Sequence, residues 1–138
     1  MAAVIRALVT AAVGAALVVP AASLAATPHA KLSNCGRLEE HPAQLVLACA
    51  DANYELAQLA WSSWGAASAS AVGKVRANDC TPYCAAGHFH TYKAVLVASG
   101  RQVCHGVPSY AEVRISFPGK TPYPKAKPAD LTYPRPCH

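Results

Sequence analysis

Hydrophobic residues recur at every second position of residues 110–117, which is the pattern of a β-strand with one buried face. Val113, Ile115 and Phe117 share that face, and polar side chains separate them. Residues 89–99 form a second predicted strand, whose centre is continuously apolar. We therefore expect these two segments to contribute strands to the core of the domain.

Two further strands and two turns follow from the same pattern. Residues 44–50 are a short apolar run between polar turn residues, and residues 68–76 alternate small side chains that suit a closely packed sheet. Asn78–Cys84 is rich in turn-forming residues and predicts a loop. Gly100 and Arg101 predict a turn leading into residues 102–105.

Residues 54–64 fit either a helix or a strand. Leu56 and Leu59 have helical spacing, whereas the two tryptophans, the serine pair and the following glycine favour a strand, which we predict. Side chains alternate along a strand, so Trp61 and Trp64 should point to opposite faces unless a bulge intervenes. One tryptophan would then lie in the core and the other at the surface.

Short strands separated by turn signals predict a mainly β fold, either a small antiparallel sandwich or an open barrel braced by disulfides. This β-rich domain covers residues 44–117. Residues 26–43 precede it as an irregular arm with a turn at residues 34–36. Residues 118–138 contain many prolines and several basic residues, and they predict an extended tail.

Residues 1–25 have the organisation of an export signal. Arg6 supplies the positive charge of its first region, and an uncharged apolar stretch follows at Ala7–Val19. Small residues then predict cleavage after Ala25 or Ala26. The alternative is an uncleaved anchor, which the weak contribution of alanine to membrane insertion disfavours. We expect a secreted, extracellular protein with no stable membrane insertion after cleavage.

Every cysteine of the chain follows the export signal: Cys35, Cys49, Cys80, Cys84, Cys104 and Cys137. An even number of cysteines in a short exported chain predicts disulfides, here three, whose connectivity the spacing leaves open. Small exported domains depend on such bonds because their cores are small. Cys137 is placed to tie the tail to the body of the domain.

The chain is mildly basic. It carries 12 Lys and Arg against 7 Asp and Glu, and loss of Arg6 with the signal leaves eleven against seven. This balance favours contact with anionic surfaces such as cell-wall polymers. The cations are scattered rather than clustered, so we expect no nucleic-acid partner.

A cluster of potential metal ligands extends from Cys80 to His90. Cys80, Cys84, His88 and His90 depart from the spacing of structural zinc sites, and disulfide formation competes for both cysteines. His88 and His90 occupy alternate positions at the entrance of a strand, so they share a face and are weak candidates for zinc or copper without the cysteines. We predict no bound cofactor.

The sequence carries no hydrolase motif. It lacks Gly-x-Ser-x-Gly, His-Glu-x-x-His and a glycine-rich phosphate loop, and we assign no catalytic residue. Asp51 and Asp79 lie beside turn residues, where their carboxylates should accept hydrogen bonds from local backbone amides. A small extracellular hydrolase nevertheless stays as the alternative to a non-enzymatic binding domain.

Aromatic side chains are the best candidates for binding a partner. Trp61, Trp64, Tyr83 and Tyr92 are suited to stacking on sugar rings or anchoring a protein, and each is equally suited to the core. We hypothesise a non-enzymatic exported domain that binds a cell-envelope polymer or an extracellular protein through an aromatic and basic surface.

Two strings are distinctive: Asn-Asp-Cys-Thr-Pro-Tyr-Cys-Ala at residues 78–85 and Trp-Ser-Ser-Trp-Gly at residues 61–65. With residues 35–36 and 47–53, they resemble a group of small exported actinobacterial proteins of uncharacterised function. The resemblance extends over about residues 35–99 and implies export and one compact domain, but no functional residue. Cys104 and Cys137 fall outside it, which favours their mutual pairing; the other four cysteines would then pair among themselves.

Overall fold

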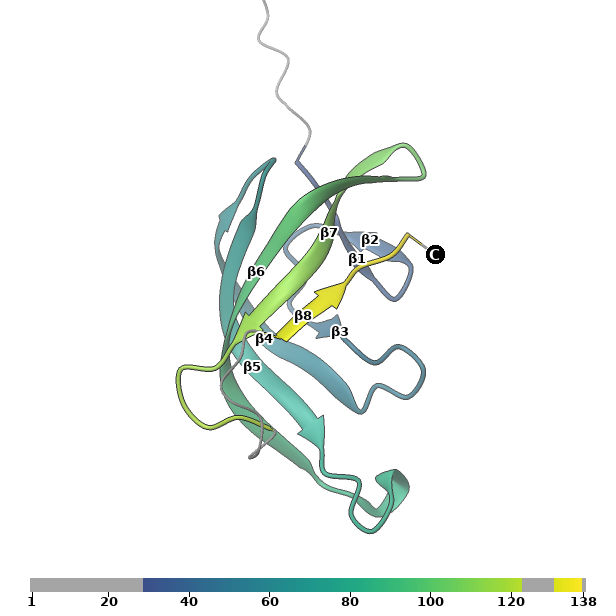
Figure 1. The fold of residues 1–138 in the computed structure, drawn as a ribbon, viewed down its shortest axis with the longest axis vertical. Helices are drawn as coiled ribbons and strands as arrows, with labels where there is room; N and C mark the ends of the chain where they lie inside the picture. The colour runs from purple at the N-terminus through teal and green to yellow at the C-terminus, as the bar shows by residue number, and fades with distance from the viewer. Residues whose placement is uncertain (1–28, 123–130, 138) are drawn as a thin grey trace, which may run out of the picture.

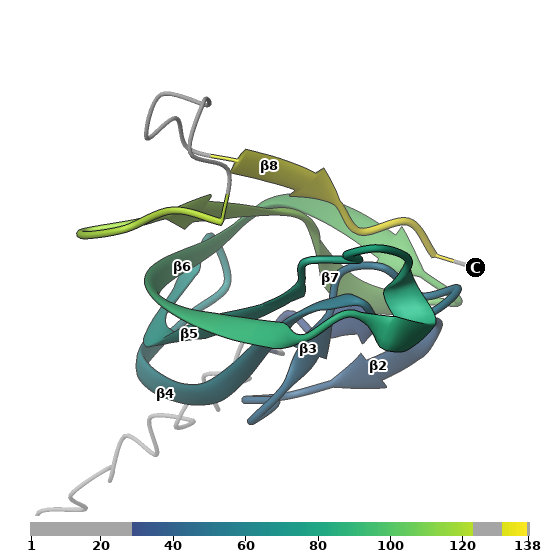
Figure 2. The same ribbon diagram turned by 90° about the horizontal axis from the view of Figure 1, so that it is seen from below.

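A curled antiparallel sheet, with a small hairpin beside it, forms the body of the molecule (Figure 1). The structure is a computed structural model and describes residues 29–122 and 131–137. The predicted export signal therefore lies outside the described residues. Strands make up the regular structure of this part apart from one 3-10 helix, so the mainly β prediction is confirmed. The curl seen in Figure 2 corresponds to the open-barrel form of that prediction.

The larger sheet has six strands, and each pairs antiparallel with the next in chain order. They are β3 (Leu45–Val46), β4 (Tyr54–Trp64), β5 (Ala69–Asn78), β6 (Phe89–Cys104), β7 (Val107–Ser116) and β8 (Leu131–Pro134). The smaller sheet is the hairpin of β1 (Leu32–Asn34) and β2 (Arg37–Glu39). The 3-10 helix η1 (Cys84–Ala86) lies in the loop between β5 and β6.

The central strands of the curled sheet bury the apolar side chains of one face. Ala71 on β5 is paired with Leu96 on β6, which is paired with Ile115 on β7. All three are almost completely buried, as is Val113 on β7. Phe117, just beyond that strand, is 8% exposed. The period-two prediction for residues 110–117 is therefore confirmed.

Strand β4 is the segment that fits either a helix or a strand, and it is a strand interrupted by two bulges. Its register with β5 shifts between Ala57 and Ala60, and again between Trp61 and Ser63. Gln58, in the first bulge, has φ 54°. Each extra residue moves the following side chains by one position, so the helix-like interval from Leu56 to Leu59 is produced by a bulge.

Gly73 on β5 makes room for the first of these bulges. A Cβ atom at this position would lie 2.9 Å from the backbone oxygen of Ala57 and 3.0 Å from the Cδ2 atom of Leu59. A side chain would therefore force the two strands apart. This close approach explains a glycine in the middle of a paired strand.

Three predicted boundaries differ from the structure. The arm predicted as irregular contains the β1–β2 hairpin, whose turn at residues 34–36 is confirmed. The predicted strand at residues 44–50 is reduced to β3, because Leu47 and Ala48 both donate their amides to the Tyr54 oxygen at the end of the pairing. The tail predicted as extended includes β8, which pairs with β7.

The turn predicted at Gly100 and Arg101 is wrong. Strand β6 continues through Gly100, which has φ 70°, and pairs with β7 on both sides of it. The chain reverses instead at His105 and Gly106, whose φ values are 50° and 80°. Two successive positive φ values suit a two-residue hairpin turn, because they match the twist of the paired strands.

Three disulfides are present: Cys35–Cys49, Cys80–Cys84 and Cys104–Cys137. The predicted pairing of Cys104 with Cys137 is confirmed, and the other four cysteines pair among themselves as expected. This last bond ties the end of β6 to the segment after β8. In the part of the chain that is described, no helix is long and apolar enough to cross a membrane.

We expect the disulfides to stabilise the fold unequally, because a longer closed loop restricts the unfolded chain more. The Cys104–Cys137 bond spans 33 residues and the Cys80–Cys84 bond spans 4. Replacing the first pair by alanine should lower the free energy of unfolding by about 4 kcal/mol, and replacing the second by about 2 kcal/mol. Urea titration of both double variants measures the difference, and equal losses would contradict it.

Candidate binding surface on the β5–β6 hairpin

The two tryptophans of β4 lie on the same face, because the second bulge shifts Trp64. Their ring centroids are 4.5 Å apart, and Trp64 also contacts the ring of Tyr110 at 5.4 Å. The Nε1 atom of Trp61 donates to the Pro42 oxygen at 2.8 Å, and that of Trp64 donates to the Ala30 oxygen at 3.0 Å. The pair therefore fastens the N-terminal arm to the sheet. Because a bulge intervenes, the division into one core and one surface tryptophan that is expected without one does not occur, and both are half-buried.

The two tyrosine candidates have different surroundings. Tyr92 is half-buried and packs against the core, whereas Tyr83 is 63% exposed in the β5–β6 loop. Phe89, which begins β6 at the base of this loop, is 45% exposed. Among the four predicted aromatic residues, Tyr83 is thus the one that the fold presents to solvent.

Asp79 organises the loop that carries Tyr83. Its Oδ1 atom accepts hydrogen bonds from the backbone amides of Thr81 at 3.1 Å and His88 at 3.0 Å. Its Oδ2 atom lies 2.8 Å from the Nε2 atom of His90. These bonds, with the His90 bond as the largest cause, lower the pKa of Asp79 to about 2. The predicted backbone-capping role of Asp79 is confirmed, and Asp51 likewise accepts from the Asn53 amide.

Asn78 holds the same loop from its other side. Its Oδ1 atom accepts from the Cys80 amide at 3.0 Å, and its Nδ2 atom donates to the Cys84 oxygen at 2.9 Å and to Asn53 Oδ1 at 2.8 Å. Together with the Cys80–Cys84 disulfide, these bonds restrict the loop. A partner that contacts Tyr83 would therefore meet a loop that is already ordered, which lowers the entropic cost of binding.

The side chains of the predicted metal-ligand cluster between Cys80 and His90 make other contacts. Cys80 and Cys84 are joined to each other, and the Nε2 atom of His90 is bonded to Asp79. His88 is exposed before the start of β6. No group of three or more His, Cys, Asp or Glu side chains in the described ranges is arranged to hold a metal ion. A site formed by His88 and His90 stays a prediction.

The Asp79–His90 pair also resembles the base and orienting residue of a hydrolytic site. A nucleophile would have to lie within hydrogen-bond reach of His90. Within the described part of the chain, the only side-chain hydrogen bond of His90 is to Asp79, and the nearby Thr81 hydroxyl donates to the Asp79 backbone oxygen. In the described residues, the geometry therefore supplies a base, His90, and an orienting carboxylate, Asp79, but no nucleophile bonded to the base.

The outer face of the β5–β6 hairpin carries a row of side chains that we call the basic–aromatic stripe. Strand pairing places Val72 opposite Val95 and Lys74 opposite Lys93, with Phe89 at the end of β6. The guanidinium of Arg76 lies 4.8 Å from the centre of the Phe89 ring, on the same face. The stripe comprises Val72, Lys74, Arg76, Phe89, Lys93 and Val95, and the adjoining loop carries the exposed Tyr83.

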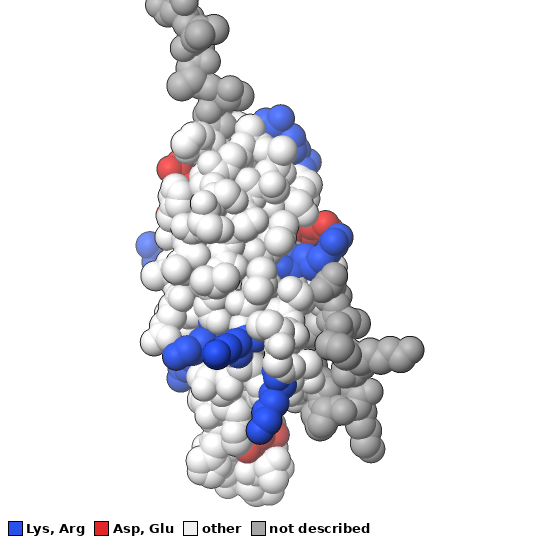
Figure 3. Space-filling view, turned by 90° about the vertical axis from the view of Figure 1, so that its left-hand side faces the viewer, with Lys and Arg blue, Asp and Glu red and all other residues white. Residues whose placement is uncertain are grey.

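The two lysines give the stripe its uncompensated charge. Lys74 and Lys93 are both exposed, and like charges directly opposite each other destabilise a sheet. No carboxylate among the described residues forms a salt bridge with either one. Arg76, by contrast, is paired with the buried Glu55. Figure 3 views the molecule from this side and shows Lys and Arg side chains gathered above the lower tip.

A shallow groove of about 370 Å³ lies beside the two lysines. Its lining is mainly apolar and includes Val72, Val95 and Pro118. Val72 is 55% exposed, although it lies in the middle of the sheet. The groove thus combines apolar surface with two cations at its edge.

Sequence reasoning identified Tyr83 but missed the lysine pair. Lys74 and Lys93 are far apart in the chain, and neither belongs to a local cluster of basic residues. Only the register of β5 with β6 brings them together. The alternation of the two segments indicates which side chains share a face of the sheet, but it does not indicate which residue of one strand pairs with which residue of the other.

Comparison of the chain with protein-family models, curated proteins and solved structures gave no match. The resemblance to small exported actinobacterial proteins therefore stays a prediction. The candidate surface rests on its own geometry and charge.

The bonds to Asp79 give the loop a defined acid sensitivity. Because the pKa of Asp79 is lowered from 3.8 to about 2, its bonds stabilise the loop above pH 3.8, and this contribution is lost as the pH falls towards 2. We expect an NMR titration of the Asp79 carboxyl carbon to show a midpoint near pH 2. His90→Ala should raise that midpoint, whereas His88→Ala, which keeps the backbone amide, should leave it unchanged.

Proposed function

We propose that this protein is a secreted, non-enzymatic domain that binds an anionic polymer of the cell envelope through the basic–aromatic stripe. The observation that carries the proposal is the exposed Lys74–Lys93 pair, two facing cations with no carboxylate bonded to them in the described residues. Such an arrangement costs stability in the free protein. An anion placed between the two ammonium groups would relieve that cost.

The shape of the stripe suits an extended polymer better than a single small ion. The stripe extends from Val72 to the level of Phe89, which is paired with Asn78, and the six residue steps between Val72 and Asn78 cover about 20 Å. The charges occupy its middle, and the exposed ring of Phe89 lies at one end, next to the loop that carries the exposed Tyr83. Phosphate or carboxylate groups would pair with the lysines, while sugar rings would stack on the aromatic side chains.

The disulfides support the proposed location. Bonds such as these form and persist in oxidising compartments, and all three join parts of the same small domain. The apolar stretch at residues 7–19, which lies outside the described residues, supplies the export signal in this proposal. An extracellular protein is the other kind of partner that the surface would suit.

Charge reversal at Lys93 tests the proposal directly. We expect the purified, disulfide-bonded protein to sediment with isolated cell wall at low salt. Lys93→Glu should weaken this binding by about tenfold, because it removes one favourable charge contact and adds a repulsive one. Binding should also weaken as salt is raised, since the charges are exposed. A sedimentation assay with increasing amounts of cell wall measures the affinity.

Arg101→Glu is the matched control for this experiment. Arg101 is exposed on the same strand as Lys93, eight residues further along, and outside the stripe. The same change of charge there should leave cell-wall binding nearly unaffected. Equal losses for the two variants would show that only net charge matters, and failure of the wild type to sediment would remove the proposal. Tyr83→Ala should weaken binding at all salt concentrations.

A further inference from the structure

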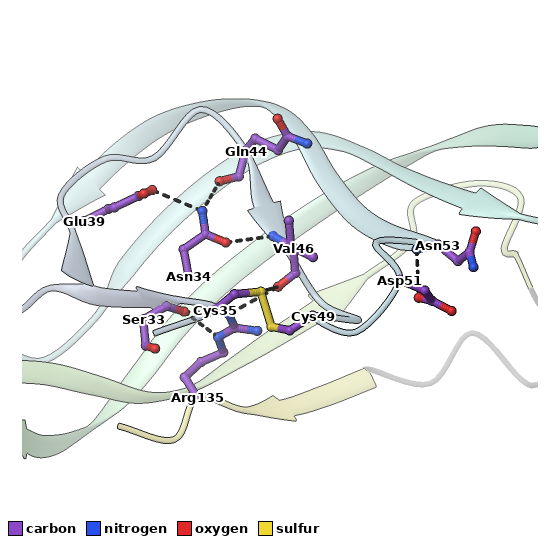
Figure 4. Close-up of a disulfide and its surroundings, with 10 residues drawn as sticks. All are labelled: Ser33, Asn34, Cys35, Glu39, Gln44, Val46, Cys49, Asp51, Asn53 and Arg135. Carbon is purple, nitrogen blue, oxygen red and sulfur yellow. Dashed lines mark hydrogen bonds between the residues drawn. A yellow bond between two sulfur atoms is a disulfide. The ribbon is translucent and has the colours of Figure 1, made fainter. Parts of the chain in front are cut away.

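A second candidate site is built where the C-terminal strand meets the N-terminal hairpin. A cavity of about 460 Å³ lies between the β1–β2 turn, the segment after β3, and the end of β8. Its lining includes Ser33, Cys35, Leu47, Cys49, Pro134 and Arg135. Figure 4 shows the Arg135 side chain extending from the C-terminal segment towards Ser33 and Val46, beside the Cys35–Cys49 disulfide. The cavity is thus formed by segments far apart in the sequence.

Arg135 is the charged group of this cavity, and it is only 5% exposed. Its Nε and Nη2 atoms both donate to the backbone oxygen of Ser33, and Nη2 also donates to that of Val46 at 3.2 Å. These bonds hold the guanidinium in one orientation. Among the described residues, no atom accepts a hydrogen bond from the remaining guanidinium nitrogen, Nη1.

The buried charge has no counterion in the described part of the chain. No carboxylate there lies within 4.0 Å of the Arg135 guanidinium. The nearby Glu39 accepts from Asn34 and faces Arg37, and Asp51 accepts from the Asn53 amide. Burial accordingly lowers the pKa of Arg135. A buried charge is normally paired, because removing it from water is otherwise costly.

Holding the C-terminal segment in place does not by itself require a charge. Gln102 on β6 shows this, because its neutral Nε2 atom donates to the backbone oxygens of Tyr110 on β7 and of Arg135, and so holds the C-terminal segment from the other side. A neutral donor at position 135 would serve the Ser33 and Val46 oxygens in the same way. The cationic group therefore points to an anion that enters the cavity.

We propose that this cavity binds a small oxyanion, with a carboxylate on a compact apolar body as the preferred chemistry. Arg135 pairs with the carboxylate, since a guanidinium presents its donors in a plane that matches two oxygens. Leu47, Pro134 and the disulfide contact the apolar body. The site is separate from the basic–aromatic stripe, so either proposal can fail without the other.

Thermal unfolding in the presence of candidate anions tests this site. The probes are sodium acetate, sodium benzoate and inorganic phosphate, with the ionic strength held constant. A ligand at about ten times its dissociation constant should raise the unfolding midpoint by about 5 °C, and the rise should saturate. We expect the largest effect from benzoate. A larger effect of phosphate would instead identify an inorganic anion site, and absence of a saturable rise with all three would overturn the proposal.

Filling the cavity distinguishes binding from a general salt effect. Leu47→Trp leaves Arg135 and its backbone partners in place but occupies the apolar side of the cavity, so it should abolish the benzoate shift. Val103→Trp makes a similar change at an exposed position outside the cavity and should keep the shift. Lys93→Glu should also keep it. A shift that persists in Leu47→Trp would overturn the proposal even if Arg135 variants fail to fold.

Discussion

The pairing of β5 with β6 is the constraint on which the rest of the structure depends. It sets the face on which each side chain of the central sheet lies, and Ala71, Leu96 and Ile115 form one buried row because of it. A slip of one residue would turn Lys74 towards the core and expose the buried row. The same register that buries the core therefore aligns the two lysines on the outer face.

The small size of several core side chains makes close packing necessary elsewhere. Four of the buried side chains on β5 and β6 are alanines, beside the larger Val75 and Leu96, so these two strands bury less apolar volume than strands of larger side chains would: Ala69, Ala71, Ala94 and Ala98. The bulges of β4 bring the two tryptophans together, Trp64 packs on Tyr110, and both indoles donate hydrogen bonds to the N-terminal arm. The arm is thus part of the folded body, held by aromatic side chains that sequence reasoning considered for binding.

The last described strand and the first hairpin meet in a way that explains both the third disulfide and the buried arginine. β8 adds to β7, Cys137 is bonded to Cys104, and Arg135 reaches the hairpin and β3 through backbone oxygens. A polar, proline-rich sequence becomes ordered here because neighbouring strands satisfy its backbone groups. The cavity beside Arg135 forms where these segments meet. Hydrogen bonds to backbone oxygens need only a neutral donor, so they do not explain why the residue at this position is charged.

Local patterns in the sequence determined the β class, the strand at residues 110–117 and the loop around Asp79, because alternation and turn chemistry act over short distances. The even number of cysteines, a property of composition, indicated the disulfides. The tertiary structure alone decided the partners of those elements. Leu56 and Leu59 share a face because a bulge lies between them. Strand β8 forms by pairing with β7, and the register of β5 with β6 places Lys74 opposite Lys93. These relations depend on contacts between segments distant in the chain, and no local pattern encodes which segments will meet.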